Sequence, residues 1–135
     1  MGFVLHVLHP GEQLTALSAT QSSTYAGDIK HPAAYCIDGE TRPGKGMRKY
    51  AFCHTQRERY PWFAADYGKT YVIERVKIFN RHDCCGKRTR NVEVRVSEEL
   101  PTSASQKFSG GSLLGTFAGP GSNGQHIEIS GGDIW

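Results

Sequence analysis

The strongest constraint on the fold is the segment Val92–Val96, in which apolar and charged side chains alternate at every position. Successive side chains of an extended chain point to opposite faces, so this alternation predicts a strand with one buried face. β-branched and aromatic residues between turn signals predict four more strands, over Trp62–Tyr67, Tyr71–Asn80, Leu113–Phe117 and His126–Ile129. Short strands without a sustained helical period predict an all-β domain, either a sandwich or a barrel.

The first 60 residues show a weaker pattern. A strand is predicted near Leu14–Leu17, and polar residues from Thr20 to Ser23 indicate a loop after it. The region Tyr25–Tyr60 is irregular apart from the short insert Ala33–Ile37. A loop-rich region of this length is usually functional, or is held by ligands or cross-links. We therefore expect an N-terminal extension over residues 1–13 and one domain over residues 14–135.

Composition narrows the function classes. The formal net charge of +3 is mild and falls well short of that of a nucleic-acid-binding tail. No apolar run approaches the length of about 18 residues that a transmembrane helix needs. The apolar run Phe3–His9 is interrupted by histidines and lacks a basic leader, so we do not interpret it as a signal peptide.

The adjacent pair Cys84-Cys85 requires an explanation of its own. Neighbouring Cα atoms are about 3.8 Å apart, closer than in most disulfides, so a bond between these two residues would be strained. Strained elements concentrate at functional sites, and such a ring would present a flat, apolar sulfur surface. The alternatives are that each cysteine pairs with Cys36 or Cys53, or that the cysteines bind metal. Metal binding is poorly supported, because no Cys-x-x-Cys pair occurs.

Charged side chains surround this pair. Arg81 and Arg88 each present several hydrogen-bond donors in a fixed fork, and Asp83 is placed to hold them. Fixed donors beside an apolar surface suit a ligand that has hydroxyl groups on one edge and a carbon face on the other, as a monosaccharide does. The simpler interpretation is a surface ion-pair cluster at the end of a strand, worth little energy.

These residues resemble the signature of the F-type lectins, or fucolectins. The pattern is Arg81-x-Asp83-x-x-x-x-Arg88 with His54 upstream, and it contains the segment Arg-x-Asp-Cys-Cys-Gly-x-Arg. Other segments are similar to that family, and to the broader discoidin-type domains, in order and spacing: Ala19–Ser23, Cys36–Gly39, Pro61–Tyr71 and Val76–Arg81. The resemblance implies a jelly-roll β-sandwich of the discoidin or galactose-binding-like type, with the binding loops at one end.

The resemblance also implies a site for terminal L-fucose. His54, Arg81 and Arg88 would donate hydrogen bonds to the sugar, and Asp83 would orient the arginines. The Cys84–Cys85 disulfide would pack against the sugar ring. Tyr25 would line the pocket for the methyl group, and one further pocket residue would come from a second loop, with three candidates: Met47, Tyr50 and Phe52.

In the family a structural calcium ion lies beneath the loops. Calcium prefers carbonyl and carboxylate oxygens, and the matching positions are Tyr35, Asp38, Glu40 and Ala51. We also expect a Cys36–Cys53 disulfide that closes a loop around this region. The family usually ends in one more strand, carrying a calcium-binding glutamate. The sequence reaches Trp135 before such a segment, so we expect that strand to be missing, and the run Gly2–His9 or a neighbouring chain to be candidates for its place.

Three alternatives frame the functional prediction. Catalysis is disfavoured, because a disulfide-bonded cysteine cannot attack and only Asp83 could serve a glycosidase that needs two acids. Binding of a polyanion or membrane surface would use the basic residues Arg48, Lys49, Arg57 and Arg59. We predict a secreted, non-enzymatic lectin whose partners are fucosylated glycans, and a homo-oligomer would add avidity.

Overall fold

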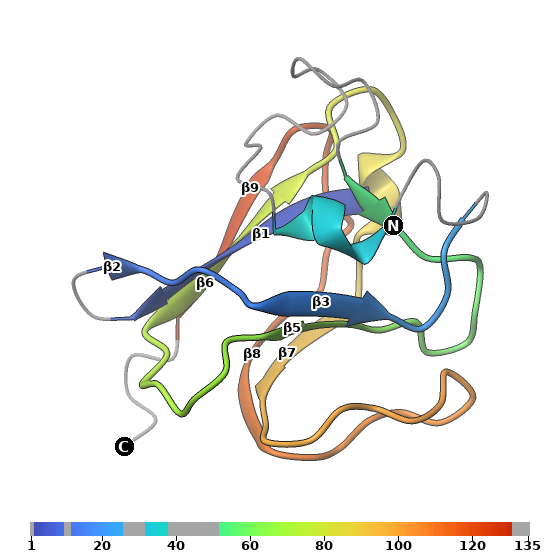
Figure 1. Cartoon of the computed structure of the whole chain (residues 1–135). Helices are drawn as coiled ribbons and strands as arrows, with labels where there is room; N and C mark the ends of the chain where they lie inside the picture. The colour runs from blue at the N-terminus through green and yellow to red at the C-terminus, as the bar shows by residue number, and fades with distance from the viewer. Residues whose placement is uncertain (1, 10–11, 26–31, 38–51, 131–135) are drawn as a thin grey trace.

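The computed structural model describes residues 2–9, 12–25, 32–37 and 52–130, and Figure 1 shows its strands. Nine strands and two short 3₁₀ helices make up this part of the chain. In chain order they are β1 (Gly2–His9), β2 (Glu12–Gln13), β3 (Ser18–Gln21), η1 (Ala33–Cys36), β4 (Cys53–His54), β5 (Phe63–Asp66), β6 (Arg75–Asn80), η2 (Gly86–Arg88), β7 (Val92–Val96), β8 (Ser112–Phe117) and β9 (His126–Ser130). The described residues contain no helix long and apolar enough to cross a membrane.

The main sheet is antiparallel and has the order β2-β1-β6-β9, with β4 also pairing with β1. Leu5 of β1 lies opposite Ile78 of β6, and Ile78 lies opposite Ile127 of β9. Strand β1 comes from the segment that the sequence analysis assigned to an N-terminal extension. Its Phe3 and Val7 side chains are buried, so this segment contributes directly to the core.

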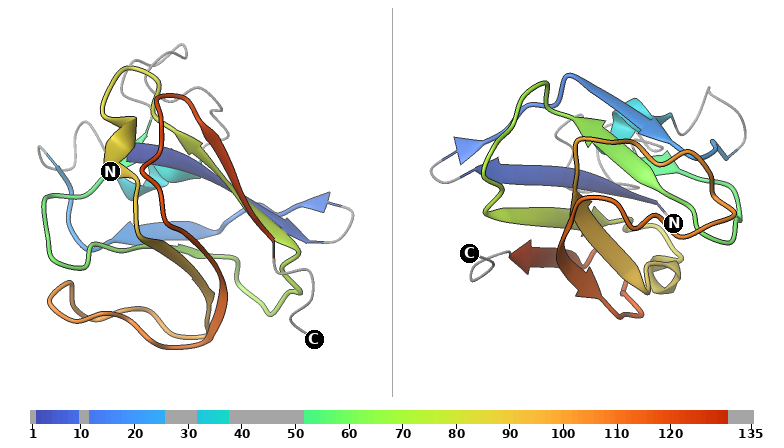
Figure 2. Two further views of the ribbon diagram at one scale, coloured as in Figure 1. Left: turned by 180° about the vertical axis from the view of Figure 1, so that it is seen from behind. Right: turned by 90° about the horizontal axis from the view of Figure 1, so that it is seen from below.

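Two strand pairs, β3–β5 and β7–β8, cover the main sheet. Figure 2 shows both pairs packed across from β1, β6 and β9. Phe3 on β1 meets Phe63 on β5 edge to face, with ring centroids 5.5 Å apart. Apolar side chains from the two layers form one core: Val76, Ile78, Ile127 and Ile129 from the main sheet, with Phe63, Val92, Val94, Leu114 and Phe117 packed against them. The all-β sandwich prediction is therefore confirmed.

Most of the strand predictions agree with the structure. The alternation in Val92–Val96 forms β7, and three of the other predicted segments form β5, β8 and β9. The segment predicted to start at Tyr71 becomes a strand only at Arg75. The strand expected near Leu14–Leu17 lies instead at Ser18–Gln21, because the small and polar residues there pair with β5.

The strands end in loops at two opposite ends of the sandwich. At one end, β6 leads into residues 81–91 and the turn 118–125 leads into β9. At the other end, residues 97–111 connect β7 to β8 and form the long loop at the bottom of Figure 1. Asn80, the last residue of β6, shares the inward face of that strand with Val76 and Ile78 and is completely buried. A polar group at that depth must find partners, and these partners organise the candidate site.

Candidate functional site

The segment from Arg81 to Thr89 forms a compact loop around the adjacent cysteines. Cys84 and Cys85 are joined by a disulfide, with Cα atoms 3.7 Å apart. Cys85 has a φ of 65°, a left-handed conformation, and the helix η2 begins directly after it. Backbone N–H groups of Arg88 and Thr89 donate to the carbonyls of Cys85 and Gly86, at 3.0 and 3.1 Å. The local hydrogen bonds therefore tie the disulfide and Arg88 into one unit.

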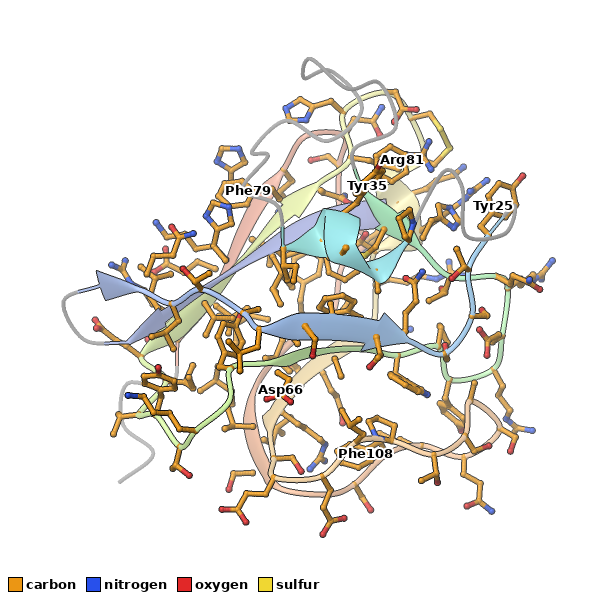
Figure 3. All side chains as sticks on the ribbon, in the orientation of Figure 1. Tyr25, Tyr35, Asp66, Phe79, Arg81 and Phe108 are labelled. Atoms are coloured by element: carbon orange, nitrogen blue, oxygen red, sulfur yellow. A yellow bond between two sulfur atoms is a disulfide. The ribbon has the colours of Figure 1, made fainter. Side chains whose placement is uncertain are left out.

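Arg81 is held on two sides. Its Nε and one terminal nitrogen each donate a 2.8 Å hydrogen bond to the two carboxylate oxygens of Asp83. Its guanidinium carbon lies 4.5 Å from the ring centroid of Phe52, a cation–π arrangement. Figure 3 shows Arg81 at the loop end of the sandwich. The remaining guanidinium nitrogen is left for other contacts, in a direction that the carboxylate and the ring both restrict.

The hydrogen bond from Arg81 lowers the pKa of the Asp83 carboxyl below its usual value, although partial burial works against this. The positive charge of Arg81 and backbone hydrogen bonds at Asp83 and Cys84 lower it further. The Asp83 carboxyl is therefore ionised at neutral pH and keeps accepting from Arg81. Asp83 therefore holds Arg81, one of the two arginines that it was expected to orient, whereas no hydrogen bond or ion pair with Arg88 occurs among the described residues.

Phe52 lies under the site and has no exposed surface. It packs with Phe79 of the main sheet, and its ring lies 6.5 Å from the ring of His54. It therefore supports Arg81 from below and does not line an open pocket for a sugar methyl group. The other two candidates for that pocket, Met47 and Tyr50, lie outside the residues that the structure describes.

His54 comes from β4 and is buried, with only 8% of its surface exposed. Its Nδ1 lies 2.6 Å from the carbonyl oxygen of Thr55. A carbonyl oxygen only accepts, so Nδ1 must carry the proton at this contact. The hydrogen bond fixes the orientation of the imidazole ring and directs Nε2 away from Thr55.

Tyr25 joins His54 from a different loop. The backbone N–H of Tyr25 donates to the His54 carbonyl at 2.8 Å, and the two rings lie 4.9 Å apart. Tyr25 is 53% exposed, so its ring is accessible beside a buried histidine. The structure therefore brings Tyr25 and His54 together, and Phe52 links His54 to Arg81.

Arg88, the second arginine of the predicted set, is exposed. It lies in η2 and makes no side-chain hydrogen bond or ion pair within the described ranges. Its donors are thus available to a ligand. The two arginines therefore differ: contacts with Asp83 and Phe52 orient the Arg81 guanidinium, whereas the Arg88 side chain extends from the hydrogen-bonded backbone of η2.

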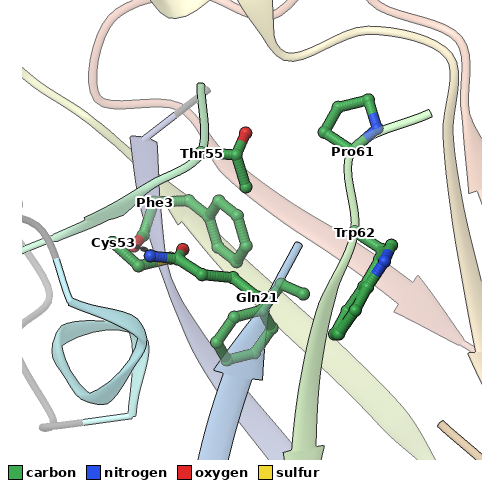
Figure 4. A pocket seen from close by; sticks show the side chains of 7 residues that line it. Phe3, Gln21, Cys53, Thr55, Pro61 and Trp62 are labelled. Atoms are coloured by element: carbon green, nitrogen blue, oxygen red, sulfur yellow. Dashed lines mark hydrogen bonds between the residues drawn. The ribbon is translucent and has the colours of Figure 1, made fainter. Parts of the chain in front are cut away.

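A small pocket lies beside β4, where Cys53 and Thr55, the two sequence neighbours of His54, form part of its lining. Figure 4 shows that mostly apolar and aromatic side chains line it, namely Phe3, Gln21, Cys53, Thr55, Pro61, Trp62 and Phe63. It contains neither arginine of the signature nor the Cys84–Cys85 disulfide. Its lining therefore offers no charged donors, and it is distinct from the site built around Arg81.

The profile of NedA-like, galactose-binding domains matches residues 35–129, which include His54 and the whole Arg81–Arg88 segment. This chain belongs to that family. The resemblance to the F-type lectin branch is also confirmed, because curated fucolectins and a solved fucolectin structure are among its relatives.

Two curated relatives and one structure illustrate this membership. A fucolectin of Anguilla anguilla is 31% identical over 84 residues, which cover 61% of this chain and 52% of the relative. A pentraxin fusion protein of Xenopus laevis is 28% identical over 88 residues, which cover 65% of this chain and 20% of the relative. The F-lectin from the serum of the striped bass, Morone saxatilis, has a TM-score of 0.66 and 25% identity, covering 84% of this chain and 36% of that chain. The chain thus matches about half or less of the length of each relative.

Other expected features of this galactose-binding-like domain lie beside β4. A disulfide joins Cys36 of η1 to Cys53 of β4, one residue before His54, with Cα atoms 5.1 Å apart. Both cysteines are buried, so the bond anchors the His54 strand to η1. Of the expected calcium ligands, Tyr35 lies in η1, while Asp38, Glu40 and Ala51 fall outside the described residues. The calcium site stays a prediction.

Sequence reasoning missed the residues that hold the disulfide loop in place. Asn80, Thr89 and Asn123 link this loop to the turn before β9. The only sequence signal was Asn80, a polar residue at an inward-facing position of a strand. Asn123 lies in the segment Gly119–Gly124, whose glycine, proline and serine residues indicate only an ordinary turn.

Proposed function

We propose that this domain is a lectin that binds terminal L-fucose on glycans through His54, Arg81 and Arg88. The observation that carries the proposal is the double restraint on Arg81, whose donors are aligned by Asp83 and whose face rests on Phe52 beside the Cys84–Cys85 disulfide. Preorganised donors beside an apolar surface suit a sugar with a polar edge and a carbon face. The fucolectin relatives support this choice of sugar.

Selectivity follows from the same arrangement. A site that is built to hydrogen-bond particular hydroxyl groups penalises a ligand that leaves its donors unpaired. We propose that Tyr25 packs against the apolar part of the sugar next to His54, because its ring is exposed there. The half-buried disulfide would cover the ring face of the sugar near Arg88.

The proposal also covers where the protein acts and whether it is an enzyme. Two disulfides favour an oxidising compartment, and one structural relative is a serum protein, so we propose that this protein is secreted. We propose that it acts without catalysis, since the carboxylate in the signature is committed to Arg81. Weak single sites would gain avidity if several domains were displayed together.

A glycan array tests the function directly, with free L-fucose as a competitor. The expected result is binding to fucosylated glycans that free L-fucose abolishes. Arg88→Ala should weaken binding about tenfold or more, since hydrogen bonds to charged groups contribute about 1.5–3 kcal/mol. Arg90→Ala is the matched control, because Arg90 is also exposed but lies outside the signature, and it should bind like the unchanged protein.

An array without fucosylated hits would contradict the proposal. Binding dominated by sulfated or phosphorylated ligands would instead favour the polyanion alternative, in which the exposed Arg57 and Arg59 would take part. Equal losses in Arg88→Ala and Arg90→Ala would point the same way.

A further inference from the structure

Asn80 connects two loops through a completely buried amide. Its Nδ2 donates to the carbonyl oxygens of Gly86 and Ser122, both at 3.0 Å. Its Oδ1 accepts a 2.8 Å hydrogen bond from the hydroxyl of Thr89, which is also buried. One side chain at the end of β6 therefore fixes the disulfide loop and the turn before β9 at the same time.

The turn before β9 makes three further contacts with the disulfide loop. The Oδ1 of Asn123 accepts from the backbone N–H of Gly86 at 2.8 Å. The N–H of Gly124 donates to the Arg81 carbonyl at 2.8 Å, and the N–H of Gly121 donates to the Thr89 carbonyl at 2.9 Å. The turn thus contacts the disulfide loop at its start, its middle and its end. Figure 2 shows the two segments running side by side.

Gly86 is the centre of this contact. A Cβ atom at Gly86 would overlap the backbone of Ser122 and Asn123, so only glycine allows the two segments to approach so closely. Gly86 also follows Cys85 directly and precedes Arg88 by two residues. Any displacement of the Gly86 amide would therefore move the disulfide and Arg88 together.

We propose that the segment Gly119–Gln125 is a positioning element of the sugar site, and that Asn123 is its principal positioning residue. This inference rests on the proposed function, because it assigns to that site a supporting segment outside the signature. Asn123 acts through its hydrogen bond to the Gly86 N–H, and it thereby fixes the position and orientation of the Cys84–Cys85 disulfide and of the Arg88 backbone. Supporting contacts of this kind raise affinity by lowering the ordering cost of binding.

A pair of substitutions at Asn123 tests the proposal. Asn123→Ala removes the acceptor for the Gly86 N–H, whereas Asn123→Asp keeps an oxygen at that position. Asn123 is exposed, so both variants should fold. We expect Asn123→Ala to weaken L-fucose binding about fivefold, the value of one typical hydrogen bond, and Asn123→Asp to stay within about twofold of the unchanged protein.

Amide hydrogen exchange of Gly86, measured without sugar, gives the second readout. We expect the Gly86 amide to lose protection in Asn123→Ala and to keep it in Asn123→Asp. Unchanged affinity in folded Asn123→Ala would overturn the proposal, even if that variant melts at a lower temperature. If the unchanged protein fails to bind L-fucose, the proposed function is wrong. In that case unchanged Gly86 protection in Asn123→Ala would overturn the positioning role as well, and selective loss of that protection would support it.

Discussion

The two loops that flank β7 are built in different ways. Residues 81–91 enter β7 from the site end, and residues 97–111 leave it at the opposite end. The first loop is held by two buried polar side chains, Asn80 and Thr89, which bond to each other, and Asn80 also bonds to Gly86 in the loop and to Ser122 in the turn before β9. The local contacts of the second loop, such as Ser97 to Glu99 and Ser103 to Ser105, are exposed, and the loop is joined to β7 by groups that lie at the surface or are half-buried.

Exposure follows the same division. Asn80 and Thr89 have 0% and 1% of their surface exposed, whereas Leu100 in the distal loop is 55% exposed. The bonds that connect the distal loop to the rest of the domain are made by exposed or half-buried groups: the Tyr60 N–H donates to the Ala104 carbonyl, Lys107 pairs with Glu93, and Arg95 donates to the carbonyls of Ser109 and Gly110. This difference in burial indicates that the site loop is held more tightly than a loop that only connects two strands would need to be. A loop that must present donors at fixed positions needs such constraints.

The largest expected effect is on stability at the site end. Asn80→Ala leaves the Gly86 and Ser122 carbonyls and the Thr89 hydroxyl without their buried partner. We expect the free energy of unfolding to fall by about 3 kcal/mol, because unpaired buried polar groups are costly. Urea denaturation monitored by tryptophan fluorescence measures this change. A loss below about 1 kcal/mol, in the range of an ordinary surface mutation, would break the comparison between the two loops.

The second prediction compares the effect on L-fucose affinity of replacing Phe52, at the site end, with that of replacing Phe108, in the distal loop. Phe52→Leu removes the aromatic face under Arg81 and keeps an apolar side chain in the core. We expect L-fucose affinity to fall about fivefold, in line with a cation–π contact of about 1 kcal/mol. Phe108→Leu in the distal loop is the control, and its affinity should not change; Figure 3 shows Phe108 at the end away from Arg81. Similar affinities for the two variants would show that Phe52 does not support Arg81.

The Asp83 carboxyl should respond to pH in a defined direction. Its pKa in the folded protein lies below the ordinary value of an aspartate carboxyl, chiefly because Arg81 donates a hydrogen bond to it. A depressed pKa contributes stability that is present above the unfolded value of about 3.9 and is lost as the pH falls through the folded value. A carboxyl carbon NMR titration should therefore give a midpoint below that of an ordinary aspartate carboxyl, and Arg81→Ala should raise it. Equal midpoints in the two proteins would contradict the pairing.

The smallest effect is expected in the distal loop. Ser103→Ala removes hydrogen bonds that are local and exposed. Its effect on the free energy of unfolding should stay within about 0.5 kcal/mol, as is usual for surface positions. Thermal unfolding of this variant next to the unchanged protein gives the value. A loss as large as that in Asn80→Ala would show that the two loops are constrained alike.

Local sequence patterns predicted the features that depend on neighbouring residues. Alternation over Val92–Val96 predicted β7, and the β-branched residues of His126–Ile129 predicted β9. The Cys84-Cys85 pair among basic residues indicated where the site loop lies. Such features can be predicted from the sequence because each depends on side chains that are adjacent in the chain.

Contacts between segments that are distant in the chain could not be predicted from local sequence patterns. Asn123 and Gly86 are separated by 37 positions, and nothing in either local sequence indicates that they meet. The run Gly2–His9 pairs with β6, and this pairing brings Phe3 and Val7 into the core. The sequence of β3, Ser-Ala-Thr-Gln, has no apolar alternation that would indicate a strand, and this segment is a strand because it pairs with β5.

The central claim is that preorganised donors around Arg81 bind a neutral sugar. Calorimetric titration of L-fucose into the folded protein, at low and at high salt, tests it most directly, with Arg81→Ala as the control. We predict saturable binding that changes little with salt, since a hydrogen-bonded neutral ligand releases no counterions, and no binding to Arg81→Ala. The absence of binding to the unchanged protein, or an affinity that falls steeply with salt, would contradict the claim.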